Sequence, residues 1–369
     1  MPSDGIQHPT FKFTRSRTLR LLVGSLVWVL AFTAACLVIR RVFPFPEIPI
    51  VHAKLMHFRA HPNDYDTLFL GSSRINFQII SAKFDQLTQA GGVPTKSFNA
   101  GVAGMRPPED SYFFDQLLAA RPQRLRWVFI ELIQIRPQIN QELRGTMRAQ
   151  YWHDWPRMWL MWQRLTYLKP ADKRRSPAKI WNELREPLAE LPDHFGHFVR
   201  EMSNLGRGDF LARQLLRRRA DWRLTLSDQL GPDLAGWRTT GRGEDMPPDI
   251  RPNYEKELAE RLIEPAVRDL AEPVSQGALE AMIAKVERLG ATPVLIVPPM
   301  TGKRTFYPRP ERARKTIVLD FDDPVRFPEL YENRNRLDRD HLNTAGAEVF
   351  TRLLAEHWVA AVKARGEGH

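Results

Sequence analysis

Residues 67–74 read Thr67-Leu68-Phe69-Leu70-Gly71-Ser72-Ser73-Arg74, and this stretch decides the fold class. Its apolar run lies between an aspartate and a glycine, which is typical of a buried strand that ends in a turn. Apolar runs also occur at residues 127–132 and 292–297, a short strand is predicted at 96–99, and helical patterns occur at 75–87, 107–120, 275–289 and 344–363. Because nearly all-apolar strands alternate with helices, we expect an α/β fold, a three-layer parallel sheet flanked by helices.

Near the N-terminus, residues 21–39 contain no charged side chain. At the rise of an α-helix this segment is about 28 Å long, enough to cross the apolar part of a bilayer. More basic residues precede the segment than follow it, which favours an N-terminus on the inner side. They are Lys12, Arg15, Arg17 and Arg20 before it, and Arg40 and Arg41 after it.

We therefore expect a single-pass protein of the bacterial inner membrane, with the lipid bilayer as a partner and the remaining chain periplasmic or otherwise extracytoplasmic. A cleaved lipoprotein signal at Cys36 is the alternative, but the apolar run continues beyond this cysteine. The expected division is a cytoplasmic tail (1–20), an anchor (21–39), a linker (40–63), a first part of the main domain (64–139), a mostly helical insertion (140–270) and a second part (271–369).

Composition narrows the function classes. The chain has 369 residues, with 54 Lys and Arg against 43 Asp and Glu and a net charge of +11. No zinc-finger spacing or RNA-recognition motif accompanies this charge, so we expect no nucleic-acid partner.

The single cysteine excludes an intrachain disulfide and a cysteine-based metal site. His52, His57 and His61 lack acidic partners at ligand spacing and are predicted to be exposed linker residues, so neither a metal nor a cofactor is expected.

The insertion contains four tryptophans at helical spacing. Trp152, Trp155, Trp159 and Trp162 recur at i, i+3, i+7 and i+10, which places them on one face of a helix. One interpretation is that this face packs on the core. The other is an exposed platform that binds sugar rings or faces a membrane.

Three separate segments carry possible chemistry. Ser73 follows the first predicted strand at the edge where parallel sheets build their active sites. Asp338 precedes His341 by three residues, so its carboxylate can orient the imidazole that activates a serine. Gly104 lies in a glycine-rich turn that Asn99 can brace, and its N–H is a candidate oxyanion donor. Taken singly, these segments are equally consistent with turn residues, a helix-capping acidic loop and a tight strand-to-helix connection.

Their order along the chain resembles the SGNH (GDSL-like) hydrolase family over residues 64–137 and 275–360. Residues 68–73 look like its first block, 99–104 like its second and 338–341 like its last. The resemblance implies Ser73 as nucleophile, His341 as base and Asp338 as its partner. It implies that the N–H groups of Ser73 and Gly104 hold the oxyanion, and Arg74 is a possible supporting residue.

The third family block departs from the pattern. The family has Gly-x-Asn-Asp there, with the Asn as an oxyanion donor, whereas this chain has residues 131–136, Glu-Leu-Ile-Gln-Ile-Arg. Gln134 can substitute only if its amide reaches the site. The sequence also resembles membrane-anchored proteins of cell-envelope polysaccharide acylation, such as those of alginate acetylation and teichoic-acid alanylation.

This second resemblance implies ester hydrolysis or O-acyl transfer on an acylated envelope polysaccharide, with a membrane-bound acyl-donor protein as a possible partner. The alternatives are a catalytically degenerate scaffold or carbohydrate-binding protein of the same fold, and a lipid esterase whose Trp- and Arg-rich insertion lies on the bilayer.

Overall fold

The computed structural model describes residues 15–42, 45–168, 176–204, 207, 225–240, 246–270, 272–302 and 304–366. Its centre is a five-stranded sheet in which every pairing is parallel. The strands are β1 (Thr67–Leu70), β2 (Ser97–Asn99), β3 (Trp127–Glu131), β5 (Thr292–Val297) and β7 (Ile317–Asp320), in the spatial order β2-β1-β3-β5-β7. The predicted α/β class is confirmed at this level.

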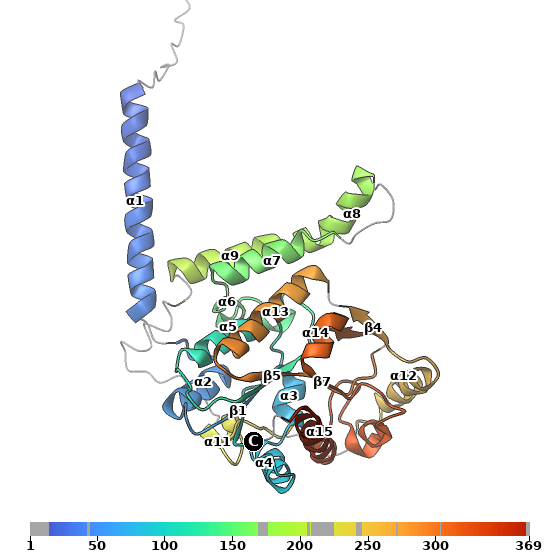
Figure 1. The fold of residues 1–369 in the computed structure, drawn as a ribbon. Helices are drawn as coiled ribbons and strands as arrows, with labels where there is room; N and C mark the ends of the chain where they lie inside the picture. Colours follow the sequence, from blue (N-terminus) through green and yellow to red (C-terminus); the bar gives the residue numbers. More distant parts are fainter. Residues whose placement is uncertain are drawn as a thin grey trace, which may run out of the picture.

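Helices cover both faces of the sheet (Figure 1). One face packs on α2 (Val51–Ala60), α5 (Glu109–Leu118) and α13 (Pro273–Arg288), and the other on α4 (Ser81–Ala90) and α15 (Thr344–Arg365). Successive side chains of a strand point to opposite faces. Accordingly, Leu68 and Leu70 belong to the first core, whereas Phe69 belongs to the second, where Trp358 is fully buried.

The chain order around β1 creates a crevice. The path runs from β1 to β2 on one side and then to β3 on the other side of β1. Ligands of such doubly wound sheets bind outside the carboxyl ends of the strands where the order reverses. Here that position lies between the ends of β1 and β3, next to Ser73.

Several elements differ from the expectations. The expected helix 75–87 is two helices, α3 (Ser73–Gln78) and α4, because Ile79 and Ile80 are extended. The N–H of Ile80 donates to Thr351 Oγ1 of α15 instead of continuing a helix. Strand β7 was not expected, nor was the pair of strands β4 (Val267–Leu270) and β6 (Arg304–Tyr307), the first of which lies inside the expected helical insertion.

The segment 40–63 is not simply a linker, because residues 51–60 form α2 with a buried face. His52 and His57 are half-buried rather than exposed, and His57 Nε2 lies 2.9 Å from the hydroxyl of Tyr65. The remaining elements lie mainly in the insertion and near the C-terminus. They are η1 (Gln141–Leu143), α6 (Met147–Gln150), α7 (Trp155–Leu165), α8 (Pro177–Leu188), α9 (Leu191–Ser203), α11 (Leu226–Leu230), α12 (Arg251–Ile263), α14 (Pro310–Lys315), η3 (Pro328–Tyr331) and η4 (Asn333–Asn335).

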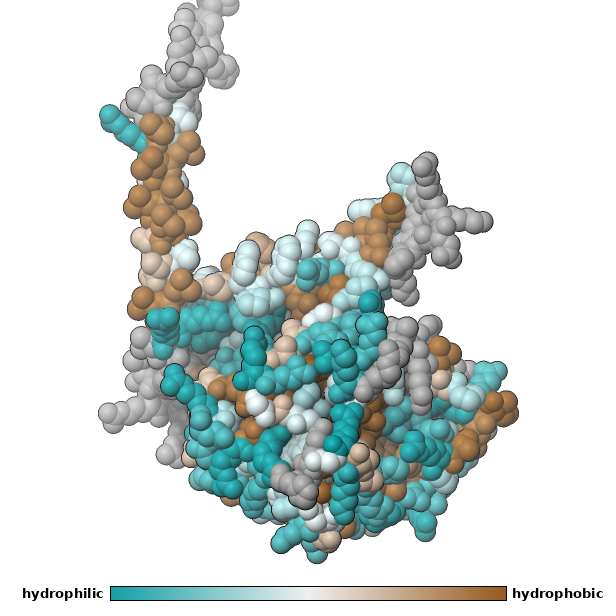
Figure 2. Space-filling view, viewed as in Figure 1, coloured by the Kyte–Doolittle hydropathy of each residue, from teal (hydrophilic) through white to brown (hydrophobic). Residues whose placement is uncertain are grey.

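The N-terminal helix α1 (Arg15–Val42) stands away from the body of the molecule, and its apolar surface is brown in Figure 2. Its segment Thr18–Arg41 is long and apolar enough to cross a membrane, and only 6% of its most apolar window is buried. The helix meets the body at its C-terminal end. There Asn204 Nδ2 donates to the carbonyl of Cys36 at 3.0 Å, and Arg40 forms an ion pair with Glu201 at 3.5 Å.

Candidate functional site

Ser73 is the first residue of α3, directly after the turn that ends β1. Gly71 in this turn has no room for a side chain, since a Cβ would lie 2.4 Å from Glu131 Oε2. The side chain of Ser72 caps α3 by accepting from the N–H of Arg74. These contacts place Ser73 at the crevice with its side chain half-buried.

The structure brings Ser73 and His341 together from positions 268 residues apart. Ser73 Oγ lies 2.7 Å from His341 Nε2, and His341 Nδ1 lies 3.0 Å from both carboxylate oxygens of Asp338. The three side chains therefore form a hydrogen-bonded relay from hydroxyl to imidazole to carboxylate. In this geometry the carboxylate selects the tautomer with the proton on Nδ1 and leaves Nε2 free to accept the proton of the serine.

Asp338 is held as an anion by its own loop. Its Oδ1 accepts from the N–H groups of Asp340 and His341, each at 2.8 Å. Burial raises the pKa of Asp338, but the hydrogen bond and charge of His341, together with the two amide hydrogen bonds, outweigh it and lower the pKa of this carboxyl. A carboxylate that stays ionised can stabilise the imidazolium that forms when His341 takes a proton.

Arg336 holds this loop from behind, although the side chain is fully buried. Its guanidinium donates to the carbonyls of Asp338, Arg339 and Pro299 and lies against the rings of two tyrosines. Because it binds backbone carbonyls, Arg336 is a positioning residue for the loop that carries Asp338 and His341.

The glycine-rich turn after β2 is braced by Asn99. Its amide donates to the carbonyls of Ile75 and Ile79 at 2.7 and 2.8 Å, and its Oδ1 accepts from the N–H of Gly101 at 3.0 Å. Gly104 has a φ of +74°, a conformation that favours glycine. Within the described residues, the N–H groups of Gly104 and Ser73 have no protein acceptor, so both are free to bind an oxyanion.

Lys54 of α2 supports the same turn from the core. Its Nζ donates to Asn76 Oδ1 at 2.8 Å, to the carbonyl of Asn99 at 2.9 Å and to that of Gly101. Burial lowers the pKa of Lys54 well below its usual value, and the charge of Arg238 adds to this effect. Lys54 thus ties α2 to the turn that presents Gly104.

Glu131 occupies the place where the family pattern has its third block. Its carboxylate accepts from the N–H of Ser72 at 2.6 Å and from the hydroxyl of Ser72 at 3.1 Å, and it forms an ion pair with Arg74 at 2.6 Å. The side chain is buried, so it holds the turn of Ser73 in place rather than contacting a substrate. Arg74 is therefore bound to the same carboxylate.

A cavity of about 750 Å³ opens at these residues. Ser73, His341, Gly104 and Gln134 all line it. Five arginines also line it, namely Arg74, Arg106, Arg136, Arg164 and Arg339. Three of them pair with carboxylates, whereas Arg106 and Arg136 have no such partner within the described residues. Partial burial lowers the pKa of Arg106, and the charges of Arg136 and Arg74 add to this effect, so the cavity is suited to an anionic ligand.

The four tryptophans at helical spacing, Trp152, Trp155, Trp159 and Trp162, do not line this cavity. Trp152 is buried and stacks on His153 with ring centroids 3.7 Å apart. Trp155, Trp159 and Trp162 are exposed on α7, so packing on the core holds only for Trp152.

The sequence analysis missed three residues that position the site. Glu131 had a signal, because an acid at the carboxyl end of an apolar strand is unusual. Lys54 was missed because Pro44, Pro46 and Pro49 precede its segment and make it resemble a linker. Arg336 had no local signal, since its contacts with Pro299 and Tyr254 come from segments far along the chain.

A comparison of the chain with protein-family models and with curated proteins finds no match to either.

Proposed function

We propose that the protein is a serine-dependent ester hydrolase or O-acyltransferase of the SGNH type, anchored by α1 and acting outside the cytoplasm on an acylated envelope polysaccharide. The observation that supports the proposal is the relay in which Ser73 Oγ lies 2.7 Å from His341 Nε2 and His341 Nδ1 lies 3.0 Å from Asp338. No part of this relay requires a metal or an organic cofactor.

In the first half of the reaction, Ser73 Oγ attacks the acyl carbonyl while His341 Nε2 takes the hydroxyl proton. The oxyanion accepts from the N–H groups of Ser73 and Gly104, and Gln134, which lines the cavity, is the candidate for a third donor. Collapse of the intermediate breaks the ester bond, and His341 returns the proton to the departing alcohol. The acyl group is then bound to Ser73.

In the second half, water or a sugar hydroxyl gives its proton to His341 and attacks the acyl-enzyme. The Ser73 oxygen leaves and regains its proton from His341. Water as acceptor makes the protein an esterase, and a sugar hydroxyl makes it a transferase. Arg106 and Arg136, which pair with no carboxylate among the described residues, favour an acceptor that carries carboxylates or phosphates near the reacting hydroxyl.

The test is turnover of p-nitrophenyl acetate by the full-length protein in detergent, together with covalent labelling by a fluorophosphonate. Ser73→Ala is expected to lose labelling and to lose turnover by about 1,000-fold or more, with an unchanged circular dichroism spectrum. Ser227→Ala, at an exposed serine of α11, is the matched control and should behave as wild type. Equal labelling and equal turnover in wild type and Ser73→Ala would contradict the proposal.

A further inference from the structure

The helices α7, α8 and α9 present an uncovered apolar surface, which we call the aromatic face. On α7, Trp155 is 68% exposed, and on α9, Phe195 is 56% exposed. The face consists of Trp155, Trp159, Trp162 and Phe195, which line one groove, and of Val199 one turn further along α9; on α8, Trp181 is also exposed. Single exposed apolar residues are common on soluble proteins, but a contiguous group of this kind marks a surface that contacts another apolar phase.

Sequence periodicity produces this face. On α7 the exposed tryptophans recur at i, i+4 and i+7, while Met158, Met161 and Leu165 of the same helix are buried against the body. On α9, Phe195 and Val199 are one helical turn apart and exposed, while His194 and His197 are buried. Between the two helices lies an apolar groove whose lining includes Trp155, Trp162 and Phe195.

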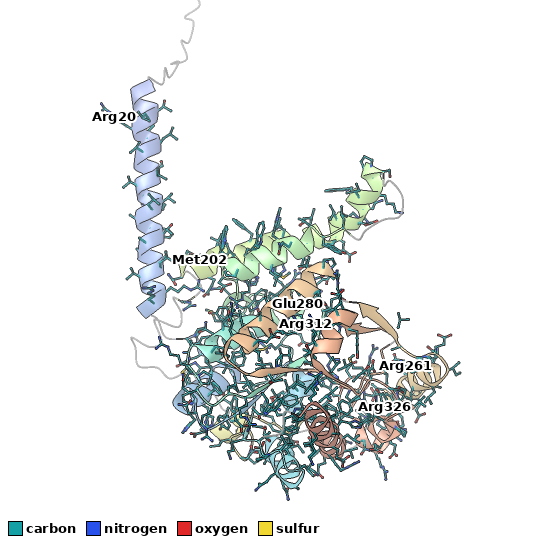
Figure 3. The ribbon with its side chains drawn as sticks, viewed as in Figure 1. Arg20, Met202, Arg261, Glu280, Arg312 and Arg326 are labelled. Carbon is teal, nitrogen blue, oxygen red and sulfur yellow. The ribbon has the colours of Figure 1, made fainter. Side chains whose placement is uncertain are left out.

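The position of α1 identifies what covers the face. The end of α9 contacts α1 through Asn204 and Glu201, which bind Cys36 and Arg40 at the point where the apolar run of α1 ends. Figure 3 marks Met202 at this junction. Figure 1 shows α7 and α9 running roughly perpendicular to α1 beside its C-terminal part, with the rest of the body on one side of them and most of the length of α1 on the other. If α1 crosses a bilayer, the surface of that bilayer lies along α7 and α9.

The chemistry of the face agrees with this geometry. Tryptophan is enriched where proteins meet the headgroup region, because its ring is apolar and its N–H is polar. An amphipathic helix binds in the plane of the interface through its apolar side. In Figure 2 the layer of α7–α9 shows pale and brown atoms above a largely teal body.

We propose that the aromatic face lies in the headgroup region of the bilayer that α1 crosses, so that the protein contacts the membrane through a surface as well as through an anchor. The proposal rests on α1 spanning the membrane and is independent of the chemistry at Ser73. It holds the body in one orientation relative to the lipid, with α4 and α15 on the side away from it.

The test places a spin label at single cysteines in the full-length protein, in a Cys36→Ser background reconstituted into phosphatidylcholine–phosphatidylglycerol nanodiscs. Trp159→Cys and Phe195→Cys report on the aromatic face. Gln86→Cys, exposed on α4, is the aqueous control, and Leu30→Cys in α1 is the membrane control. The measured quantity is the ratio of label accessibility to oxygen and to a water-soluble nickel complex.

The ratio at positions 159 and 195 is expected to exceed that at position 86 several-fold and to lie between those of positions 86 and 30. An aqueous ratio at 159 and 195 with an apolar ratio at 30 would overturn the proposal while leaving the anchor intact. Dipolar broadening between labels at 159, with low accessibility to both reagents, would also overturn it, because a second copy of the chain would then cover the face. An aqueous ratio at position 30 would remove the spanning helix on which the proposal rests.

Discussion

Glu131 is buried and makes three interactions with Ser72 and Arg74, the two residues on either side of Ser73. A buried carboxylate of this kind is stable only while its partners are present. Glu131 stands where the SGNH pattern that the sequence resembles has its third block. The end of β3 here fixes the geometry of the turn at Ser73 and does not contribute an oxyanion donor.

We expect Glu131→Gln to lower both stability and turnover. The neutral amide keeps the size of the side chain but leaves Arg74 without its counter-charge and places a second donor group against the N–H of Ser72. A loss of about 3 kcal/mol in the free energy of unfolding is expected. Thermal unfolding and p-nitrophenyl acetate turnover measure the two effects, with Glu264→Gln at an exposed position as control. Wild-type stability and turnover of Glu131→Gln would show that the contacts of Glu131 with Ser72 and Arg74 have no role.

Asp110 gives the protein a pH dependence that does not involve the triad. It lies in the first turn of α5 and is 6% exposed. Burial, together with the charges of Glu109 and Glu131, raises its pKa from 3.8 to about 7. Between these two values the folded protein binds a proton that the unfolded chain releases, so the contribution of Asp110 to stability is greatest below about pH 4 and falls as the pH rises to 7.

Asp110→Asn should remove this dependence, because an amide stays neutral at every pH. The variant is expected to be more stable than wild type at pH 8, by at most about 4 kcal/mol, and little changed at pH 4. Melting temperatures of both proteins in one detergent across this range provide the measurement. Parallel pH curves for the two proteins would exclude Asp110 as the source.

At the scale of elements, the sequence predicted four of the five main strands. Three were predicted from apolar runs that are buried on both faces and bounded by polar or turn residues, and β2 was predicted from its place before the glycine-rich turn. β7 was missed, since only four residues pair with β5 and alternate residues are partly exposed. The helix expected at 75–87 is interrupted because Thr351 and Asn99 take up backbone groups of Ile79 and Ile80. Contacts from residues far along the chain overrode the local pattern in this segment.

The link between α2 and the turn at Gly104 depends on Lys54. We expect Lys54→Met to fill a similar volume while leaving Asn76 Oδ1 and the carbonyls of Asn99 and Gly101 without this donor. Buried acceptors without a donor each cost about 1–3 kcal/mol, so a clear fall in melting temperature should accompany a slower reaction at Ser73. Lys83→Met, on a partly exposed surface pair, is the control. A variant that melts and reacts as wild type would show that α2 does not support the turn.

At the scale of the whole molecule, the order of the three chemical segments in the sequence predicted which residues meet at the crevice. The fold places Ser73 after β1 and the Gly104 turn after β2, and the approach to α15 carries His341 to the same cavity, with Asp338 bonded to its imidazole. The sequence could not show how the insertion sits, because α7 packs on α9 and α9 contacts α1, both through residues distant along the chain. It also could not show which arginines face the cavity.

Part of the net charge of +11 lies at the cavity, where Arg106 and Arg136 lack carboxylate partners within the described residues. An acetylated oligosaccharide with carboxylates should have a lower KM than a neutral one of the same length. In the double variant Arg106→Gln/Arg136→Gln this advantage should fall about tenfold for each lost charged contact. Raising the salt concentration should reduce the advantage in wild type, because ions screen exposed charges.

Arg288→Gln, at the exposed end of α13, keeps the same net-charge change as each single variant without altering the cavity. Equal KM values for the two substrates in wild type would remove the anionic acceptor from the proposal while leaving the serine chemistry to be judged by Ser73→Ala alone.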